Sequence, residues 1–321
     1  MTTLFYRKKR EGVNSIETVF DSLTSLTSHK RVMLPCEGVS VISIVRNLIF
    51  VYKNRGRVNH ITGDVHYIAL VLGRDTILTI HDIGSALNGG ALKRAIIKLF
   101  WFTLPALIVR RITVISHFTR DELIAVIPFA KDKISVVHNP FNSLAHYCEG
   151  EFNGAKPTIL HVGTKSNKNL ERVIEALDGI SCRLNILGKL SDPQVEMLAQ
   201  YGIIYDSYYD LPYSEVIKLY EGCDVVSFPS LYEGFGLPIL EANAVGRVVI
   251  AGDIEVLREV ANDSAYYVDP CSVDMIREGF QRVLSDRVLR EGLIQKGRVN
   301  VERFSEEKIS AQYNELYTTI F

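Results

Sequence analysis

Cysteine is scarce in this chain, and the cysteines present form no recognisable framework. They are odd in number, widely spaced and never arranged as CxxC, at Cys36, Cys148, Cys182, Cys223 and Cys271. This spacing argues against both a set of disulfides and a zinc site. The basic residues 7–10 follow the first apolar residues, which reverses the order found in a secretory signal. We therefore expect a cytoplasmic protein that carries no export signal.

The sequence also lacks low-complexity segments and a strong net charge. Hydrophobic residues make up 47% and charged residues 23%, with a formal net charge of −1, which is ordinary globular composition. The charge is unevenly divided, however. Residues 1–150 hold 19 Lys and Arg against 11 Asp and Glu, while residues 151–321 hold 17 against 26. A basic first half favours an anionic membrane surface or a phosphate-bearing acceptor, and solvated surface is the alternative explanation.

What the chain does contain is two series of short, strand-like apolar runs separated by amphipathic segments. The first series comprises Thr2–Tyr6, Arg31–Leu34, Val58–Ile61, Thr76–Ile80, Ile112–Ile115 and Ile134–Val137. The second comprises Thr158–Val162, Arg183–Leu187, Ile203–Tyr205, Val225–Phe228, Val248–Ala251 and Tyr266–Val268. This alternation predicts an α/β protein with parallel sheets covered by helices on both faces.

The length of 321 residues exceeds what one core usually supports, so two domains of about 150 residues are expected. A polar stretch at 148–157 separates the two series of strands. We predict domains at 1–148 and 149–305, followed by a terminal helix over 306–321. Ligands of open α/β sheets bind beyond the carboxyl ends of the strands, so two such domains that face each other would form one cleft.

Residues 228–241 place two carboxylates eight positions apart around a glycine-bearing turn. Glu233 is expected on a loop and Glu241 inside a helix over 237–246. The amino end of a helix attracts a diphosphate, and carboxylates accept hydrogen bonds from sugar hydroxyls. The spacing therefore predicts a site for a nucleotide sugar, with a chance meeting of a surface glutamate and an amphipathic helix as the alternative.

This stretch resembles the signature of glycosyltransferase family 4, which comprises retaining, nucleotide-sugar-dependent enzymes of bacterial surface-polysaccharide type. Other parts of the chain resemble the family as well, at 159–172, 253–270, 10–17, 60–66 and 79–82. The resemblance implies the GT-B fold, in which two Rossmann-like parallel-sheet domains face a cleft. It also implies that the second domain binds the donor and that the last helix crosses back to the first domain.

The resemblance implies catalytic roles for His81, Lys168 and Glu233. Lys168 would neutralise the diphosphate as it leaves, and His81, at the end of a strand, would touch the transferred sugar. A solvated lysine and a structural histidine are the alternative interpretations. The implied donor-binding residues are Gly12, Gly163, Thr164, Lys165, Lys168, Gly188, Lys189, Tyr209, Leu211, Gly234, Phe235, Gly236, Leu237 and Glu241. Here Lys165 would replace an arginine that most relatives carry.

Asp64, His66 and Asp82 are the acceptor-side candidates, since each lies beside a strand end of the first half. The run 91–111 combines aliphatic and aromatic residues with five basic side chains and holds the only tryptophan. Its basic charge and Pro105 argue against a transmembrane span. Two interpretations remain, a helix buried under the first sheet and an interfacial helix near lipid.

Metal-ligand spacing is absent from the sequence, as is a strong candidate for an enzymic nucleophile. We therefore expect no metal and no cofactor. The resemblance implies a hexosyltransferase, and the absence of a nucleophile agrees with the front-face displacement of retaining relatives, in which the leaving phosphate helps to deprotonate the acceptor hydroxyl. Its acceptor would be a saccharide or lipid-linked saccharide, with peripheral contact to the inner face of a membrane and no nucleic acid partner. A sugar-nucleotide epimerase of the same fold and a non-catalytic scaffold are the alternatives. The motifs do not distinguish guanine from uracil or adenine.

Overall fold

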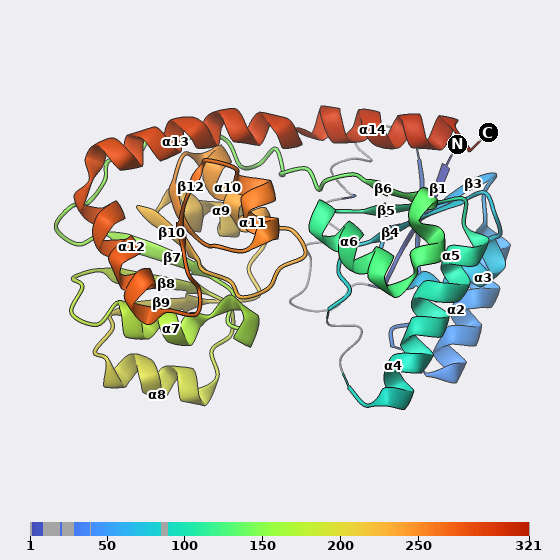
Figure 1. The fold of residues 1–321 in the computed structure, drawn as a ribbon, viewed down its shortest axis with the longest axis horizontal. Coiled ribbons are helices and arrows are strands. Elements are labelled where there is room, and N and C mark those ends of the chain that lie inside the picture. The colour runs from blue at the N-terminus through green and yellow to red at the C-terminus, as the bar shows by residue number, and fades with distance from the viewer. Residues whose placement is uncertain (1, 9–19, 21–28, 39, 85–88, 321) are drawn as a thin grey trace. The chain divides into compact units, whose positions relative to one another are not determined.

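The computed structural model describes residues 2–8, 20, 29–38, 40–84 and 89–320 (Figure 1). Contacts divide the chain into a first unit, Met1–Pro140 with Glu306–Phe321, and a second unit, Phe141–Ser305. The second unit begins earlier than the predicted residue 149. The amides of Phe141 and Cys148 bond to the carbonyls of Phe304 and Val245, at 3.1 Å each, so the segment before the predicted boundary packs on the second unit.

The first unit contains a six-stranded parallel sheet in the order β2-β1-β3-β4-β5-β6. Its strands are β1 (Thr2–Tyr6), β2 (Lys30–Met33), β3 (Val58–Ile61), β4 (Thr76–Ile80), β5 (Arg111–Val114) and β6 (Ile134–Val136). Its helical segments are α2 (Val41–Asn54), η1 (His66–Ile68), α3 (Ala69–Leu72), α4 (Ala91–Ile97), η2 (Lys98–Thr103), α5 (Leu104–Ile108), α6 (His117–Val126), η3 (Pro128–Lys133) and α14 (Glu306–Thr318). The predicted parallel α/β arrangement is confirmed for this unit.

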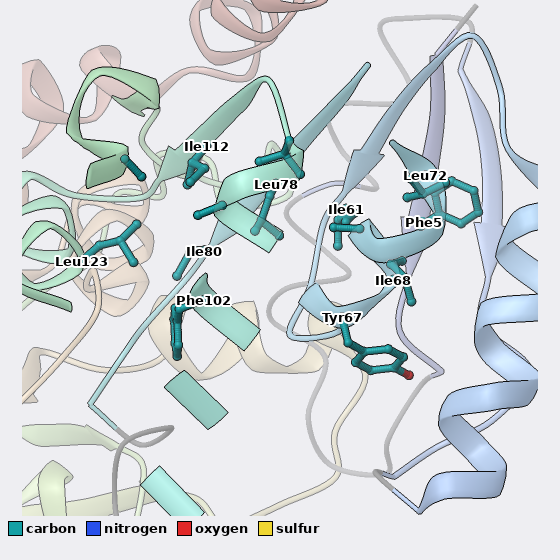
Figure 2. Packing of buried hydrophobic residues seen from close by; sticks show 14 of the residues in the cluster. Phe5, Ile61, Tyr67, Ile68, Leu72, Leu78, Ile80, Phe102, Ile112 and Leu123 are labelled. Atoms are coloured by element: carbon teal, nitrogen blue, oxygen red, sulfur yellow. The ribbon is translucent and has the colours of Figure 1, made fainter. Parts of the chain in front are cut away.

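Aliphatic and aromatic side chains from the strands and the covering helices form the core of this unit (Figure 2). Phe5, Ile61 and Leu78 project from strands, whereas Ile68 and Phe102 come from η1 and η2. All five are almost fully buried. Complete burial of such a side chain contributes about 1.5–3 kcal/mol, so the sheet and the helices of this face stabilise each other.

A buried polar network attaches the last helix to the first sheet. The Nδ1 of His60 lies 2.7 Å from the hydroxyl of Tyr317, and its Nε2 lies 2.7 Å from Oγ1 of Thr79. Thr79 in turn lies 2.7 Å from Thr113. Burial lowers the pKa of His60 to about 3, so the ring is neutral at neutral pH. The network joins α14 to β3, β4 and β5, and the last helix packs on the first unit as predicted.

The run 91–111 is not one helix. It is split into α4, a π-helical η2 and α5, and none of the residues of α4 is buried. The interpretation as a buried helix is therefore wrong for 91–97, where Leu92 is 77% exposed, and correct for Phe102, Pro105 and Ala106. Among the described residues, no helix is both long and apolar enough to cross a bilayer.

The second unit repeats the design with the strand order β12-β11-β10-β7-β8-β9, again parallel. Its strands are β7 (Thr158–Val162), β8 (Arg183–Leu187), β9 (Tyr205–Tyr208), β10 (Val225–Phe228), β11 (Val248–Gly252) and β12 (Ala265–Val268). Its helical segments are η4 (Ser166–Lys168), α7 (Leu170–Ala176), α8 (Asp192–Gln200), α9 (Tyr213–Glu221), α10 (Leu237–Val245), α11 (Glu255–Ala261), α12 (Val273–Ser285), α13 (Arg287–Val301) and η5 (Glu302–Phe304).

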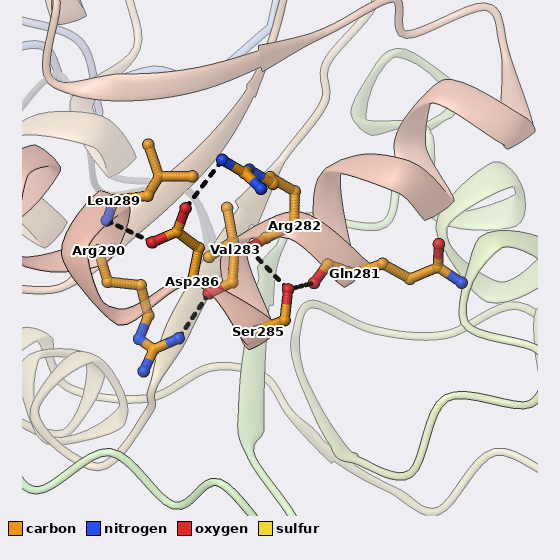
Figure 3. Close-up of polar contacts among 7 residues, drawn as sticks. All are labelled: Gln281, Arg282, Val283, Ser285, Asp286, Leu289 and Arg290. Atoms are coloured by element: carbon orange, nitrogen blue, oxygen red, sulfur yellow. Dashed lines mark hydrogen bonds and ion pairs between the residues drawn. The ribbon is translucent and has the colours of Figure 1, made fainter.

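The connection between α12 and α13 shows how local chemistry sets the ends of helices (Figure 3). The carboxylate of Asp286 accepts a hydrogen bond from the amide of Leu289 at 2.9 Å, which caps α13, and pairs with Arg282 at 2.9 Å. Arg290 donates to the carbonyl of Val283 at 2.8 Å. A carbonyl at the end of α12 and an amide in the first turn of α13 thus receive side-chain partners from the connection between the two helices.

Candidate functional site

Lys168 and Glu233 meet at the carboxyl ends of two neighbouring strands of the second unit. After β7, Gly163 adopts a positive φ of 98° and turns the chain into η4, which ends at Lys168. Glu233 lies on the loop after β10. The Nζ of Lys168 lies 2.6 Å from Oε1 of Glu233, and the two side chains are 21% and 12% exposed. The predicted cation and carboxylate therefore form one ion pair at the edge of the sheet.

Hydrogen bonds to the main chain hold the two loops together around this pair. The side chain of Asn167 donates to the carbonyl of Tyr232 at 2.9 Å. The main-chain carbonyl of Asn167 accepts from the amide of Leu231 at 2.8 Å. Asn169, in the left-handed conformation, donates to the carbonyls of Pro229 and Pro270 at 3.0 and 2.7 Å. The loops are consequently positioned by groups other than the ion pair itself.

Glu241 lies inside α10, as predicted, and two tyrosines of α9 hold its carboxylate. The hydroxyls of Tyr213 and Tyr220 donate to Oε1 and Oε2 at 2.9 and 2.6 Å. Burial raises the pKa of Glu241, while the two hydrogen bonds and the nearby Lys168 lower it in part. The sequence analysis missed both tyrosines. Their spacing of seven residues places them on one face of a helix, but it gives no sign of their contact with Glu241.

The turn into α10 depends on Gly236. Its φ of 132° disfavours any side chain, and a Cβ there would lie 2.9 Å from Cδ2 of Leu257. Leu237 then begins the helix, Pro238 has no amide hydrogen, and the amide of Ile239 donates to the carbonyl of Gly236 at 3.0 Å. The ring of Phe235 is buried and lies 5.8 Å from that of Phe304 in the second unit, and the predicted contact of Phe235 with the donor stays a prediction.

The remaining donor-binding candidates lie near the loops after β7, β8 and β9. Thr164 donates to the carbonyl of Lys189 at 2.7 Å, and a Cβ on Gly188 would lie 2.8 Å from Thr164. Lys165, Lys189 and Tyr209 are exposed, Gly234 and Leu211 are partly buried, and Gly12 lies outside the described residues. Thr164, Gly188 and Lys189 therefore lie close together. The predicted donor-binding roles of all these residues stay predictions.

The first-unit candidates gather around one pocket. Its volume is about 990 Å³, and its lining includes Asp64, His66, His81 and Asp82. The Nε2 of His81 lies 2.8 Å from the carbonyl of Thr62, and burial lowers its pKa. Burial also lowers the pKa of His66 to about 4, with its Nδ1 2.8 Å from the carbonyl of Trp101. The role of His81 as a contact of the transferred sugar stays a prediction.

Comparison with known proteins gives three findings. Residues 149–300 match the family model described as glycosyl transferases group 1. Over 103 residues the chain is 38% identical to the O-antigen chain mannosyltransferase B of Escherichia coli, covering 32% of this chain and 26% of that protein. The aligned parts cover 26% to 59% of the lengths of the first three curated relatives.

Among solved structures, sucrose-phosphate synthase from Thermosynechococcus elongatus superimposes with a TM-score of 0.77, covering 100% of this chain and 98% of that chain at 17% identity. HepE of Anabaena, in a complex with UDP and glucose, gives a TM-score of 0.78 and covers 99% of each chain at 12% identity. The fold is GT-B. At these identities the likeness shows the fold alone, and the two six-stranded parallel sheets are the two Rossmann-like domains of the GT-B fold.

Proposed function

We propose that this protein is a retaining glycosyltransferase of family 4 that moves a hexose from a nucleoside diphosphate to a hydroxyl of a saccharide or lipid-linked saccharide. We place it in the cytoplasm, with peripheral contact to the inner face of a membrane. The observation that carries the proposal is the pair Lys168–Glu233, 2.6 Å apart at the ends of β7 and β10, with Glu241 in the helix that follows.

In this proposal each group contacts a separate part of the donor. The diphosphate would lie at the amino end of α10 and against Lys168, whose charge stabilises the negative charge that grows on the leaving oxygen. Lys168 would then exchange Glu233 for the phosphate. This exchange frees the Glu233 carboxylate to accept from a sugar hydroxyl, and Glu241 would accept from the ribose hydroxyls.

The acceptor proton has a route that needs no enzymic base. In a front-face displacement the acceptor oxygen bonds to the anomeric carbon as the phosphate leaves on the same side, and the departing phosphate takes the proton. We propose that this step needs no metal ion, because Lys168 supplies the positive charge. Transfer that persists in the presence of a chelator is the expected result, and transfer restored only by a divalent ion would contradict it.

The names of similar proteins favour a hexose donor and a saccharide acceptor. The matched E. coli protein is a mannosyltransferase of the O-antigen chain, and HepE was solved with UDP and glucose. These names guide the choice of probes. Mannose and glucose are the first sugars to test, each on the nucleotide that binds.

A thermal-shift panel of UDP, GDP, ADP, CDP and dTDP tests the donor site directly. A ligand that binds only the folded protein raises the melting temperature by mass action. One nucleotide should give a clear shift, and its sugars should then react only when an acceptor is present. An epimerase would alter the sugar nucleotide without an acceptor, and a scaffold with an eroded site would bind none of the five.

A further inference from the structure

Two helices of the first unit expose apolar side chains beside a common recess. The pocket of about 990 Å³ is lined by Val45 and Leu48 of α2 on one side and by Ile96, Phe100 and Trp101 of α4 and η2 on the other. Figure 1 shows α2 and α4 alongside each other in this unit. Val45 is 48% exposed and Ile96 is 47% exposed, so this face has apolar surface available to a ligand.

The same pocket is polar where it reaches the carboxyl ends of the strands, and we call this part the polar end. It adjoins the apolar wall, since the indole of Trp101 donates to the main-chain carbonyl of Asp64 at 2.9 Å. Its lining includes Arg7, Asp64 and His81, which follow the carboxyl ends of β1, β3 and β4. A guanidinium nitrogen of Arg7 lies 3.5 Å from the carboxylate of Asp64. The acceptor-side candidates and the apolar wall therefore belong to one continuous cavity, rather than to two separate features.

Charged side chains of both signs also line the pocket, among them Lys8, Lys93, Glu37 and Asp82. A saccharide joined to a phosphate offers hydroxyl donors to carboxylates and an anionic oxygen to lysine and arginine. A simple hydrocarbon would satisfy only the apolar wall, and a free sugar only the polar end. The chemistry of the whole cavity matches an amphiphile that has both parts.

We propose that this pocket binds a lipid-linked acceptor, with the saccharide phosphate at the polar end and one hydrocarbon chain between α2 and α4. The inference rests on the proposed function and adds the place and chemical class of the acceptor's lipid. The concave shape of the pocket favours a single hydrocarbon chain as its occupant. A flat bilayer surface or a second copy of this protein would not fill a concave space.

Trp101 supplies the readout, since it is the only tryptophan and it lines the pocket. The full chain is titrated with butyl, octyl and dodecyl phosphate while Trp101 emission is followed. Affinity should rise about fourfold for each added methylene until the recess is filled. Val45→Asp and Ile96→Asp should each weaken dodecyl phosphate binding by at least tenfold, because each places a charge against the hydrocarbon.

Ile49→Asp is the matched control. Ile49 lies on α2 and is 53% exposed, close to the value for Val45, but it does not line the pocket. This variant should bind dodecyl phosphate like the unaltered protein. Equal losses in Val45→Asp and Ile49→Asp would overturn the proposal in favour of a flat lipid-binding or self-associating face. The proposal would also be overturned if the affinity obtained from Trp101 emission did not depend on the length of the alkyl chain.

The nucleotide panel separates this proposal from the proposed function. A nucleotide shift in all three variants shows that they are folded. If nucleotides stabilise the protein while alkyl phosphates fail to bind, the transferase proposal stands and the lipid site is rejected. If alkyl phosphates bind while no nucleotide does, the lipid site is retained as a binding pocket and transfer loses its support.

Discussion

Lys168 is the side chain on which the proposed chemistry depends most directly. Its ammonium pairs with Glu233 and lies 4.8 Å from the centre of the Phe228 ring. Asn167 and Asn169 fix the surrounding loops through the main chain, so removing the charge should leave the backbone in place. The charge and the fold can therefore be tested separately.

Lys168→Ala should lower kcat/KM at least about thirtyfold, which corresponds to ~2 kcal/mol of transition-state stabilisation. Steady-state kinetics with the nucleotide sugar identified above provide the measurement. Lys156→Ala is the control, because Lys156 is exposed at the opposite end of β7. A Lys168→Ala enzyme that matches the Lys156→Ala enzyme would show that Lys168 pairs with Glu233 without taking part in transfer.

Glu241→Gln should separate nucleotide binding from stability. Burial raises the pKa of Glu241, so the folded state binds the proton more tightly than the unfolded chain does. Stability from this group is consequently present below about pH 4.5 and is lost as pH rises through the raised pKa. Glu241→Gln should raise the melting temperature at pH 7 and weaken nucleotide binding about tenfold, measured by calorimetry.

A lower melting temperature together with unchanged nucleotide affinity would mean that Glu241 is a structural anchor for the two tyrosines. Tyr220→Phe is the companion variant, since it removes one hydrogen bond and leaves the carboxylate in place. It should weaken nucleotide binding less than Glu241→Gln does. The comparison assigns the effect to the charge rather than to packing between α9 and α10.

At the scale of the element, the glycine that starts α10 sets the direction of the helix. Gly236→Ala should lower the free energy of unfolding by about 1–3 kcal/mol and weaken nucleotide binding, because its φ of 132° is strained for alanine. Gly292→Ala in α13 should instead stabilise the protein by about 0.5–1 kcal/mol, since nothing lies within 4 Å of its new methyl group. Urea unfolding distinguishes the two, and equal effects would contradict the role of Gly236.

The bounds of most strands could be predicted from the sequence to within one residue, whereas those of the polar edge strand β9 could not. β1, β3, β4, β7 and β8 have the predicted bounds. β9 was predicted at Ile203–Tyr205 but lies at Tyr205–Tyr208, because Gly202 and Ile203 form the turn after α8. As the edge strand of its sheet, β9 is polar, and polar residues give little apolar pattern to read.

The candidate site was partly predictable for a related reason. Lys168, Glu233 and Glu241 belong to a local pattern of glycine, carboxylate and helix, so one stretch of sequence identifies each of them. The contacts of Tyr213 and Tyr220 with Glu241 join separate helices and depend on packing that no local pattern contains. The exposed apolar wall of α2 and α4 could not be predicted either. An apolar helix face that is buried and one that is exposed have the same sequence pattern.

At the scale of the whole molecule, acid should loosen the first unit. Burial lowers the pKa of His60 to about 3 from an ordinary value of 6.5, so the unfolded chain takes up a proton that the folded chain excludes. Stability from this group is present above pH 6.5 and is lost as pH falls toward 3, by about 1.4 kcal/mol per pH unit. Urea unfolding followed through Trp101, which lies in the first unit, should show this slope.

His60→Gln should lower stability at pH 7 and flatten the slope between pH 6.5 and 5. His161→Gln is the control, because His161 is equally buried, with its pKa lowered to about 3, but lies in the second unit. It should leave the slope reported by Trp101 unchanged. A slope that is the same in the unaltered protein and in His60→Gln would locate the acid sensitivity elsewhere.

The membership of α14 in the first unit has a consequence for synthesis on the ribosome. The second unit, Phe141–Ser305, is one continuous stretch and can close once its own residues have emerged. The first unit begins earlier but lacks Tyr313 and Tyr317 until α14 is made, so His60 and Thr79 wait for their partners. The unit whose translation starts first therefore completes its buried polar network only after the whole of the second unit has been synthesised.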